Sequence, residues 1–508
     1  MLFNTYPFIF LYLPLVLCGF FLIAPRSQRM AALWLAVASL FFYGYWNPKF
    51  VTLLLTSICF NYCAGYIIGQ PKWKVWSKAI LVGSIIANLI LLGVFKYTNF
   101  FIATANEMGG QWRLLDIVLP LGISFFTFTQ IAFLVDVYRG IAREFNFIHY
   151  LLFVTWFPHL IAGPVLHHKQ MMPQFAEANT YRPNIESITV GLTLFTLGLF
   201  KKVILADQFA IYSDQIFNLA YEGEQPKFLG AWVGALSYTL QLYFDFSGYS
   251  DMAIGLSRLF NIKLPLNFDS PYKAQNIIEF WRRWHMTLSA FLRDYLYFPL
   301  GGNRKGPIRR HLNLMITMLL GGLWHGAGWN FVLWGGLHGG YLVINHGWRW
   351  LVGSTGQVNN RLAKSASVLL TFVAVVIAWV PFRSEDFSTT QAMLFNMIGL
   401  NGISFPARLE GLLGPVFGNI FKFEGSGIVD PIVDPYVVLW LPMGFAIIWL
   451  LPNSQQWLAK YAPAWDTVIS RSRFSWQPTT LNAIFVGILF FISLICLNRA
   501  STFLYYQF

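Results

Sequence analysis

The chain has 508 residues, of which 56% are hydrophobic and 18% aromatic, whereas only 11% are charged. Soluble proteins carry about a quarter charged residues, so this composition excludes a soluble globular protein and indicates a polytopic α-helical membrane protein. The net charge of +13 does not indicate a nucleic-acid partner, because excess Lys and Arg in membrane proteins gather in cytoplasmic loops.

The first third of the chain alternates apolar runs with short basic loops. Arg26 follows the first run, Lys72 and Lys74 follow the third, and Arg139 follows the fifth. Cytoplasmic loops carry the excess of Lys and Arg, so these loops are predicted to be cytoplasmic and the first run to start outside. The predicted spans of this region are 6–24, 30–46, 50–69, 79–95 and 118–137.

Two stretches in the middle of the chain depart from a simple crossing. Within 149–165, the pairs Pro158–His159 and Gly163–Pro164 interrupt an apolar segment, and broken backbone at membrane depth needs protein or a wet cavity around it. Within 274–298, aromatic and apolar residues recur every three or four positions while the arginines point elsewhere. This spacing predicts one amphipathic, tryptophan-bearing helix in the cytoplasmic membrane interface.

The remaining apolar runs complete a single all-α membrane domain with re-entrant and interfacial helices. We expect about ten to twelve membrane crossings in all. Residues 384–435 form a long segment rich in Gly and Pro, which we place outside the cytoplasm. The further predicted spans are 188–200, 331–345, 368–380, 436–451 and 484–497. The domain 1–508 is expected to divide into N-terminal spans at 1–145, a core at 146–350 and C-terminal spans at 351–508.

The stretch 301–334 combines a basic, glycine-rich loop, an apolar run and a histidine. Arg304 and Lys305 belong to the loop, and His325 ends the apolar run between a tryptophan and several glycines. An ionisable residue at membrane depth is costly, and imidazole can take and return a proton at neutral pH. A catalytic histidine and a histidine that is hydrogen-bonded between packed helices both fit this position.

Two further groups are candidates for chemistry. His285, on the predicted interfacial helix, can act directly or can be one of the histidines that are common on such helices. In the polar stretch YFDFSGYSD, Asp245 and Asp251 are six residues apart, so a regular helix aligns them only if Gly248 interrupts it. Alternatively, the two carboxylates pair with nearby arginines and support the site.

Several common catalytic motifs are absent from the sequence, namely GxxxxGK[ST], GxGxxG after a strand, HExxH and GxSxG. ATP hydrolysis, hydride transfer and serine hydrolysis therefore lack their residues. His167 and His168 are adjacent and cannot face the same way on a helix, so no metal site is predicted. A transporter or channel that uses the carboxylates and histidines as a polar path remains an alternative, as does a non-catalytic scaffold of a secretion complex.

Four long motifs carry a resemblance to a known family. They are YFDFSGYSDMAIG at 243–255, FWRRWHMTLSAFLRDYLYFPLGGNRKG at 280–306, LLGGLWHGAGWNFVLWGGLHG at 319–339 and WVPFRS at 379–384. Together they resemble the membrane-bound O-acyltransferase family, and within it the bacterial branch that contains the alginate O-acetyltransferase membrane subunit. The resemblance runs nearly end to end, because PLGISFFTF at 120–128, FPHLIAGPV at 157–165 and the final FLYYQF also fit.

The resemblance implies a helical bundle whose tunnel connects the two faces of a bacterial inner membrane. It implies transfer of acetyl from cytoplasmic acetyl-CoA to an extracytoplasmic polysaccharide, with an SGNH-type periplasmic partner within a polysaccharide synthesis and secretion complex. Neither a metal ion nor nucleic acid is expected. Alginate and cellulose are the leading acceptors, and peptidoglycan acetylation and D-alanyl transfer are alternatives. Pro381 and the variable segment 384–435 depart from the family pattern and leave the acceptor open.

The family's functional residues can be carried over at matching positions. The invariant histidine of the family matches His325, and a second histidine that is important in the branch matches His285. His325 is the expected general base, and His285 is expected to orient the substrate or to relay the proton. Basic residues of the helix and loop can meet the phosphates of coenzyme A. The expected substrate-binding residues are Arg282, Arg283, Trp284, Arg304, Lys305, Trp324, Tyr243, Asp245, Ser247 and Asp251.

Overall fold

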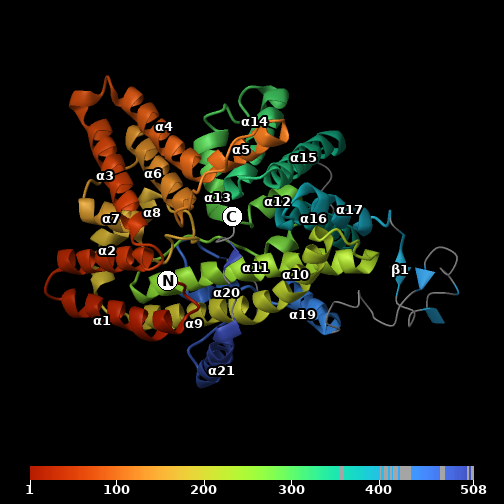
Figure 1. Ribbon diagram of the computed structural model, residues 1–508. Coiled ribbons are helices and arrows are strands. Elements are labelled where there is room, and N and C mark those ends of the chain that lie inside the picture. Colours follow the sequence, from red (N-terminus) through yellow and green to blue (C-terminus); the bar gives the residue numbers. More distant parts are fainter. Residues whose placement is uncertain are drawn as a thin grey trace.

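Helices make up most of the structure. The computed structural model describes residues 1–353, 360–400, 402–405, 410–411, 415, 422–423, 436–468, 475–499, 501 and 503–504 (Figure 1). Within these ranges the strands are limited to β1 (Ser404–Phe405) and β2 (Lys422–Phe423), which pair in parallel. The prediction of an all-α membrane fold is confirmed.

The membrane-crossing helices arise from the apolar runs. The helices long and apolar enough to cross a bilayer are α3 (Lys49–Gly69), α4 (Ser77–Lys96), the continuous segment Ile185–Tyr221 and α16 (Arg361–Arg383). Shorter apolar helices are Phe8–Ile23 with α1 (Leu13–Ile23), α6 (Ile123–Tyr138), α19 (Val437–Leu450) and α21 (Thr480–Cys496). The total of about ten to twelve crossings stays a prediction.

The N-terminal helices form one block at the side of the molecule (Figure 1). In this block α2 (Gln28–Gly44) begins at Ser27, whose side chain accepts a hydrogen bond from Met30 N. Asn61 on α3 and Asn88 on α4 exchange side-chain hydrogen bonds of 3.1 and 2.7 Å. Buried amides in a membrane must be satisfied within the protein, so this pair fixes α3 against α4. The block thereby sets where the end of α4 lies.

The predicted break within 149–165 is confirmed. α7 (Phe147–Thr155) ends before the first proline, and regular helix resumes only at α8 (His168–Ala176). The buried amides of this irregular stretch find side-chain partners, because Phe157 N donates to Ser39 Oγ at 3.3 Å and Val165 N donates to Thr287 Oγ1 at 2.9 Å. The broken backbone is therefore enclosed in protein, as its depth requires.

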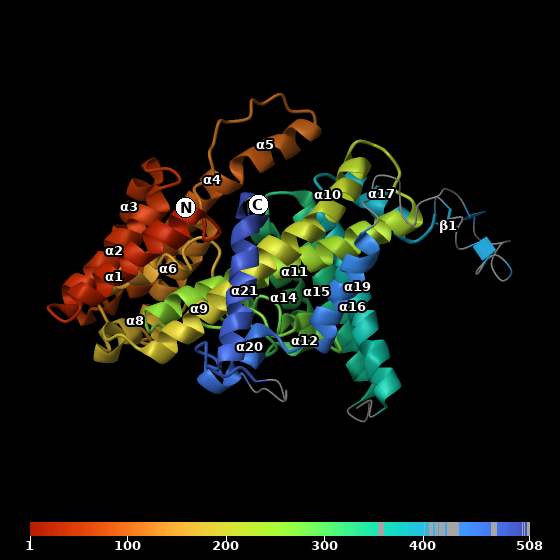
Figure 2. The same ribbon diagram turned by 90° about the horizontal axis from the view of Figure 1, so that it is seen from below.

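Gly248 does not interrupt the helix, so the alternative in which the two carboxylates are paired fits the structure. α11 (Phe228–Leu259) runs through this glycine for 32 residues without a break and packs along α9 (Ile185–Phe200) (Figure 2). A Cβ at Gly248 would lie 2.8 Å from the carbonyl oxygen of Gly198, so the glycine allows close helix contact rather than a turn. Asp245 and Asp251 pair instead with two lysines of the π-helical turn Lys201–Ala206.

The prediction of one continuous helix over 274–298 is also wrong. The segment forms α12 (Ile277–Trp281), α13 (Met286–Leu292) and a π-helical turn at Arg293–Tyr297. Between α12 and α13 a neighbouring loop supplies the backbone hydrogen bonds, because Met286 N donates to Asn267 O and Asp269 N donates to Arg283 O, both at 3.0 Å. These tertiary bonds replace intrahelical ones and break the helix at His285.

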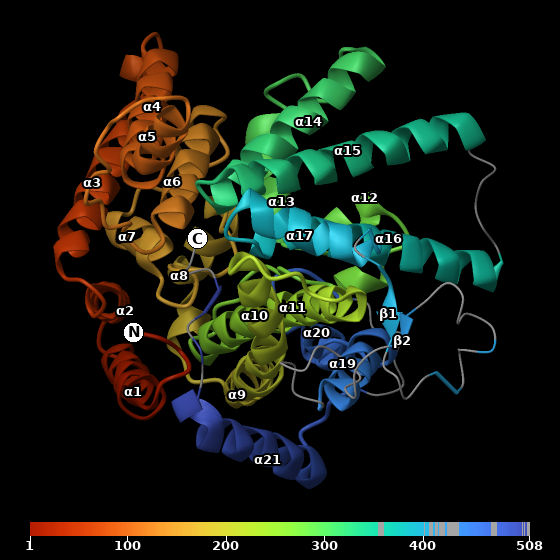
Figure 3. The same ribbon diagram turned by 45° about the vertical axis from the view of Figure 1, so that its right-hand side comes forward.

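The C-terminal half surrounds a helical hairpin. α14 (Gly306–His325) and α15 (Trp329–Val352) pack side by side, with α16 and α17 (Phe387–Met397) next to them (Figure 3). α17 occupies the start of the predicted extracytoplasmic segment 384–435. Most of the rest of that segment, and 505–508 of the final FLYYQF motif, lie outside the described residues. The proposed division at 145 and 350 stays a prediction.

Candidate active site

His325 is the last residue of α14, where the helix turns toward α15. A Cβ at Gly322 would lie 2.1 Å from the carbonyl oxygen of Phe331, and a Cβ at Gly335 would lie 2.3 Å from that of Met318. Glycine at both positions lets the two helices touch backbone to backbone. Gly322, three residues before the histidine, therefore serves the α14–α15 contact, which fixes the position of His325.

The imidazole of His325 is buried among aromatic rings. Its side chain is 4% exposed, and its ring centroid lies 5.0 Å from those of Trp324 and Trp334 and 5.3 Å from that of Phe382. Phe382 comes from α16, within the WVPFRS motif, so two motifs that are distant in the sequence meet at this histidine. This shell keeps bulk water from the ring and holds its orientation.

His285 occupies the break between α12 and α13. Its φ of 41° is left-handed, which side chains other than glycine rarely adopt, and the residue is fully buried. A strained backbone of this kind is characteristic of functional sites. Its Nδ1 lies 3.0 Å from Asn267 Oδ1, and its ring meets Phe246 edge-on with the centroids 4.8 Å apart.

The structure brings the two predicted histidines together. The ring centroids of His285 and His325 are 6.2 Å apart, with an angle of 59° between the ring planes. Trp324 lies beside both rings, at 6.2 Å from His285 and 5.0 Å from His325. Two buried imidazoles at this separation can contact the same small reacting group from two sides.

Two residues at the end of α4 hold the turn that carries His325, and the sequence analysis missed both. Lys96 Nζ donates to the carbonyl oxygens of Trp324 at 2.6 Å and of His325 at 3.1 Å. Tyr97 Oη donates to the carbonyl oxygen of Leu323 at 2.9 Å. A cation at the C-terminus of a helix is stabilising, and here it caps α14. Lys96 directly follows a predicted span, a position typical of an ordinary flanking lysine.

Replacing Lys96 with methionine is expected to lower kcat by about tenfold or more, because loss of a charged donor frees the carbonyls that fix His325. Tyr97→Phe removes one neutral hydrogen bond and should cost less. The measurement is acyl transfer by the purified variants. Lys78→Met, at the exposed other end of α4, is the matched control. Equal activity of Lys96→Met and Lys78→Met would refute this role for Lys96.

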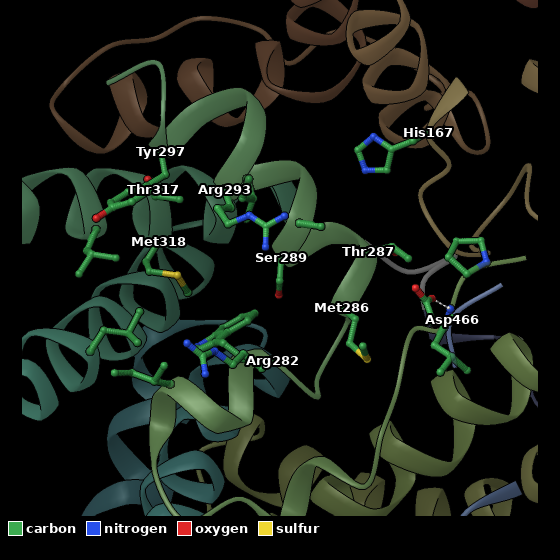
Figure 4. A pocket seen from close by; sticks show the side chains of 18 of the residues that line it. His167, Arg282, Met286, Thr287, Ser289, Arg293, Tyr297, Thr317, Met318 and Asp466 are labelled. Atoms are coloured by element: carbon green, nitrogen blue, oxygen red, sulfur yellow. Dashed lines mark hydrogen bonds between the residues drawn. The ribbon is translucent and has the colours of Figure 1, made fainter. Parts of the chain in front are cut away.

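A cavity of about 500 Å³ adjoins the break at His285. Its lining includes Met286 and Thr287, which follow the histidine, and the guanidinium-bearing Arg282 and Arg293 (Figure 4). Arg282 therefore lines a cavity, and its contact with substrate stays a prediction. The wall is otherwise largely apolar, so the cavity suits a ligand with a flexible chain and a charged end.

A second cavity of about 680 Å³ shares lining residues with the first, and more basic than acidic side chains line it. Arg139, Lys169, Arg293 and Arg304 contribute positive charge, whereas Asp136 and Asp294 contribute negative charge. Arg293 belongs to both cavities and pairs with Asp294 at 2.7 Å. His167 also lines both, and burial lowers its pKa below the usual value, so its ring is neutral at pH 7. The two adjacent cavities offer guanidinium and ammonium groups to an anionic ligand.

Three other predicted residues lie near these cavities without lining them. Arg283 pairs with Glu279 at 2.7 Å, and Lys305 is exposed at the start of α14. Trp284 is buried, with its ring centroid 4.9 Å from that of Trp379. Trp284 therefore packs in the protein interior beside Trp379. A direct contact of Arg283, Lys305 or Trp284 with substrate stays a prediction.

The predicted polar group on α11 is buried and tied to other parts of the chain. Asp245 pairs with Lys202 at 2.7 Å, and Asp251 pairs with Lys201 at 2.6 Å. Asp245 also accepts a hydrogen bond from Leu504 N at 3.1 Å, which anchors the C-terminal segment. The other two predicted residues of this group, Tyr243 and Ser247, are likewise buried. These contacts fit the supporting role, and a substrate-binding role for the four residues stays a prediction.

Comparison with known proteins identifies the family of the chain. The sequence model of the membrane-bound O-acyltransferase family matches residues 40–361, which include both histidines and Lys96. The peptidoglycan O-acetyltransferase of Helicobacter pylori is 44% identical over 80% of this chain and 81% of that protein. The probable alginate O-acetylase of Pseudomonas aeruginosa is 40% identical over 83% of this chain and 82% of that protein. The teichoic acid D-alanyltransferase of Streptococcus thermophilus is 28% identical over 61% of this chain and 75% of that protein. The chain therefore belongs to the membrane-bound O-acyltransferase family and is an acyltransferase.

Proposed function

We propose that the protein is a bacterial inner-membrane O-acetyltransferase that moves acetyl from cytoplasmic acetyl-CoA to a polysaccharide outside the membrane. The observation that carries the proposal is the buried pair His285 and His325, 6.2 Å apart, beside cavities lined by arginines. Two relatives named for O-acetyl transfer, to peptidoglycan and to alginate, support acetyl as the group and a polysaccharide as the acceptor.

The two adjacent cavities form the donor site. Coenzyme A carries phosphates, which arginine binds with a planar fork of donors, and its thioester stands at the end of a flexible arm. The phosphates would meet Lys169 and Arg304 in the basic cavity, and the arm would pass Arg293 into the apolar cavity. The thioester would then reach Met286 and Thr287, directly beside His285.

His325 serves as the general base. It takes the proton of the acceptor hydroxyl as the hydroxyl oxygen attacks the carbonyl carbon of the thioester. The C–O bond forms, the C–S bond breaks, and the proton passes to the departing thiolate, so the reaction balances without ATP. A positioned base of this kind contributes about 10²–10⁴-fold to the rate. His285, on the donor side of the pair, orients the thioester or relays the proton.

The acceptor approaches from the other side of the membrane. The hydroxyl that meets His325 belongs to an SGNH-type periplasmic partner, which then completes the transfer to the polysaccharide within a synthesis and secretion complex. The catalytic core at 146–350 contains both histidines. It also uses Lys96 and Phe382 from outside that range, so the whole chain acts as one unit.

Replacing Arg304 with alanine is expected to raise KM for acetyl-CoA about tenfold with little change in kcat, because a charged hydrogen bond to phosphate supports donor binding and not the chemical step. Arg309→Ala is the matched control, since Arg309 is nearby on α14 and exposed but lines neither cavity. The measurement is initial rate against acetyl-CoA concentration. An unchanged dependence on acetyl-CoA in Arg304→Ala would contradict the donor site.

The acceptor can be identified by measuring the transfer of labelled acetyl from acetyl-CoA by the purified protein. Peptidoglycan, alginate and cellulose are offered in parallel, each with the periplasmic proteins of the host membrane. D-alanine on a carrier thioester tests the second candidate function, which a relative named as a teichoic acid D-alanyltransferase supports at 28% identity. Label transfer from D-alanyl carrier but not from acetyl-CoA would replace the proposal with D-alanyl transfer.

A further inference from the structure

A chain of hydrogen bonds runs from the irregular stretch after α7 to the imidazole of His285. Val165 N lies 2.9 Å from Thr287 Oγ1, and Thr287 Oγ1 lies 2.8 Å from Asn267 Oδ1. Asn267 Oδ1 in turn lies 3.0 Å from His285 Nδ1. All four residues are buried. Water therefore does not compete for these bonds, and each position must be filled by a donor facing an acceptor.

The positions of the hydrogens along this chain follow from two backbone donors. A backbone N–H can only donate, so the Thr287 hydroxyl accepts from Val165 N. The backbone N–H of Thr287 points at Asn267 Oδ1, at 3.4 Å, so this position requires the oxygen and not the amide nitrogen. The Thr287 hydroxyl then gives its hydrogen to Asn267 Oδ1, at 2.8 Å. An oxygen that faces His285 Nδ1 can only accept, so Nδ1 carries the hydrogen.

We infer that Asn267 is a positioning residue that holds His285 as the Nδ1-protonated tautomer and leaves Nε2 as the proton-accepting nitrogen. The inference deepens the proposed function and rests on it for its consequence in catalysis. It also says which ring nitrogen takes part in proton transfer, because a neutral imidazole protonated at Nδ1 can receive a proton only at Nε2.

A backbone hydrogen bond supports the same role for Asn267. Asn267 binds the break twice, through Oδ1 to the side chain of His285 and through its carbonyl oxygen to Met286 N at 3.0 Å. The left-handed φ of 41° at His285 is held by these contacts. One residue therefore fixes both the backbone turn and the tautomer, and the orientation of the ring does not depend on substrate.

The tautomer can be observed without activity. Full-length protein with ¹⁵N-labelled histidine in nanodiscs gives separate nitrogen signals for the protonated and unprotonated ring positions, and His285→Gln identifies the pair that belongs to this residue. We expect His285 protonated at Nδ1 in the wild type and a mixture of tautomers in Asn267→Leu. Nδ1 found unprotonated in the wild type would overturn the inference.

Activity measurements test the consequence. Asn267→Leu should lower kcat by about tenfold or more while KM for acetyl-CoA stays within about twofold, because the residue does not line the donor cavities. Asn267→Asp keeps an acceptor oxygen and should retain most of the wild-type kcat. Equal losses in both variants, with unchanged unfolding temperatures, would overturn the positioning role.

The two hypotheses fail in different ways. An Nδ1-protonated His285 together with no acetyl transfer from acetyl-CoA would overturn the proposed function and leave the tautomer assignment standing. Acetyl transfer by the wild type together with a wild-type kcat in Asn267→Leu would overturn the inference and leave the proposed function standing.

Discussion

Replacing His325 with alanine is expected to abolish acetyl transfer while the protein remains folded. The proposed base contributes about 10²–10⁴-fold, and the rings packed against His325 are those of Trp324, Trp334 and Phe382, which cannot take a proton in its place. The fold should survive, because the α14–α15 contact depends on glycines and on the cap from Lys96, which binds a backbone oxygen of residue 325 and not its ring. The measurement is transfer of labelled acetyl from acetyl-CoA at matched amounts of folded protein.

A second histidine provides the control for that experiment. His149 lies at the start of α7 and binds Glu144 at 2.6 Å, and neither donor cavity includes it. His149→Ala should keep wild-type transfer. A folded His325→Ala protein that still supported acetylation of the polymer would favour the alternatives of a channel or a non-catalytic scaffold over an acyltransferase centred on this residue.

The two candidate histidines could be singled out in the sequence, but the local backbone structure at His285 could not be predicted. His325 stood out because an ionisable group between glycines at the end of an apolar run is costly without a function. Around His285, apolar residues keep a helical spacing through the whole of 274–298, so periodicity predicts an unbroken helix. The break depends on backbone hydrogen bonds from Asn267 and Asp269, which no local pattern encodes.

Contacts between residues that are distant in the sequence explain the other differences between the predicted and the observed structure. Gly248 looked like a helix break, whereas it meets Gly198 at a close helix crossing that becomes visible only when α9 and α11 are packed. Asp245 was expected to pair with arginines or to bind substrate, and its partner is Lys202, at the end of another helix. Lys96 looked like a flanking residue because its carbonyl partners lie more than two hundred positions away in the sequence. Sequence patterns indicate which residues are buried and which follow a helical periodicity, but they do not indicate which buried groups contact each other.

Replacing His285 with glycine is expected to lower kcat by about 10²-fold or more, with activity partly restored by imidazole in the buffer. Glycine accepts the left-handed φ of 41° without the strain of about 1–2 kcal/mol that other residues incur, so the turn between α12 and α13 should keep its shape. The variant leaves a cavity of the size of an imidazole ring, lined by Phe246 and Trp324 and by the acceptor oxygen of Asn267. Free imidazole can fill this space and supply the missing nitrogen.

His285→Ala separates the chemistry of the ring from the geometry of the turn. Alanine removes the same ring but keeps the strain of the left-handed backbone, so it should lose more thermal stability than the glycine variant. If the ring acts in catalysis, imidazole raises kcat in His285→Gly in proportion to its concentration, whereas N-methylpyrrole, which fills space but accepts no proton, does not. Rescue by both compounds would show that His285 only fills space beside His325. Failure of both compounds, with the turn intact and the cavity open to them, would contradict a proton-accepting role for His285.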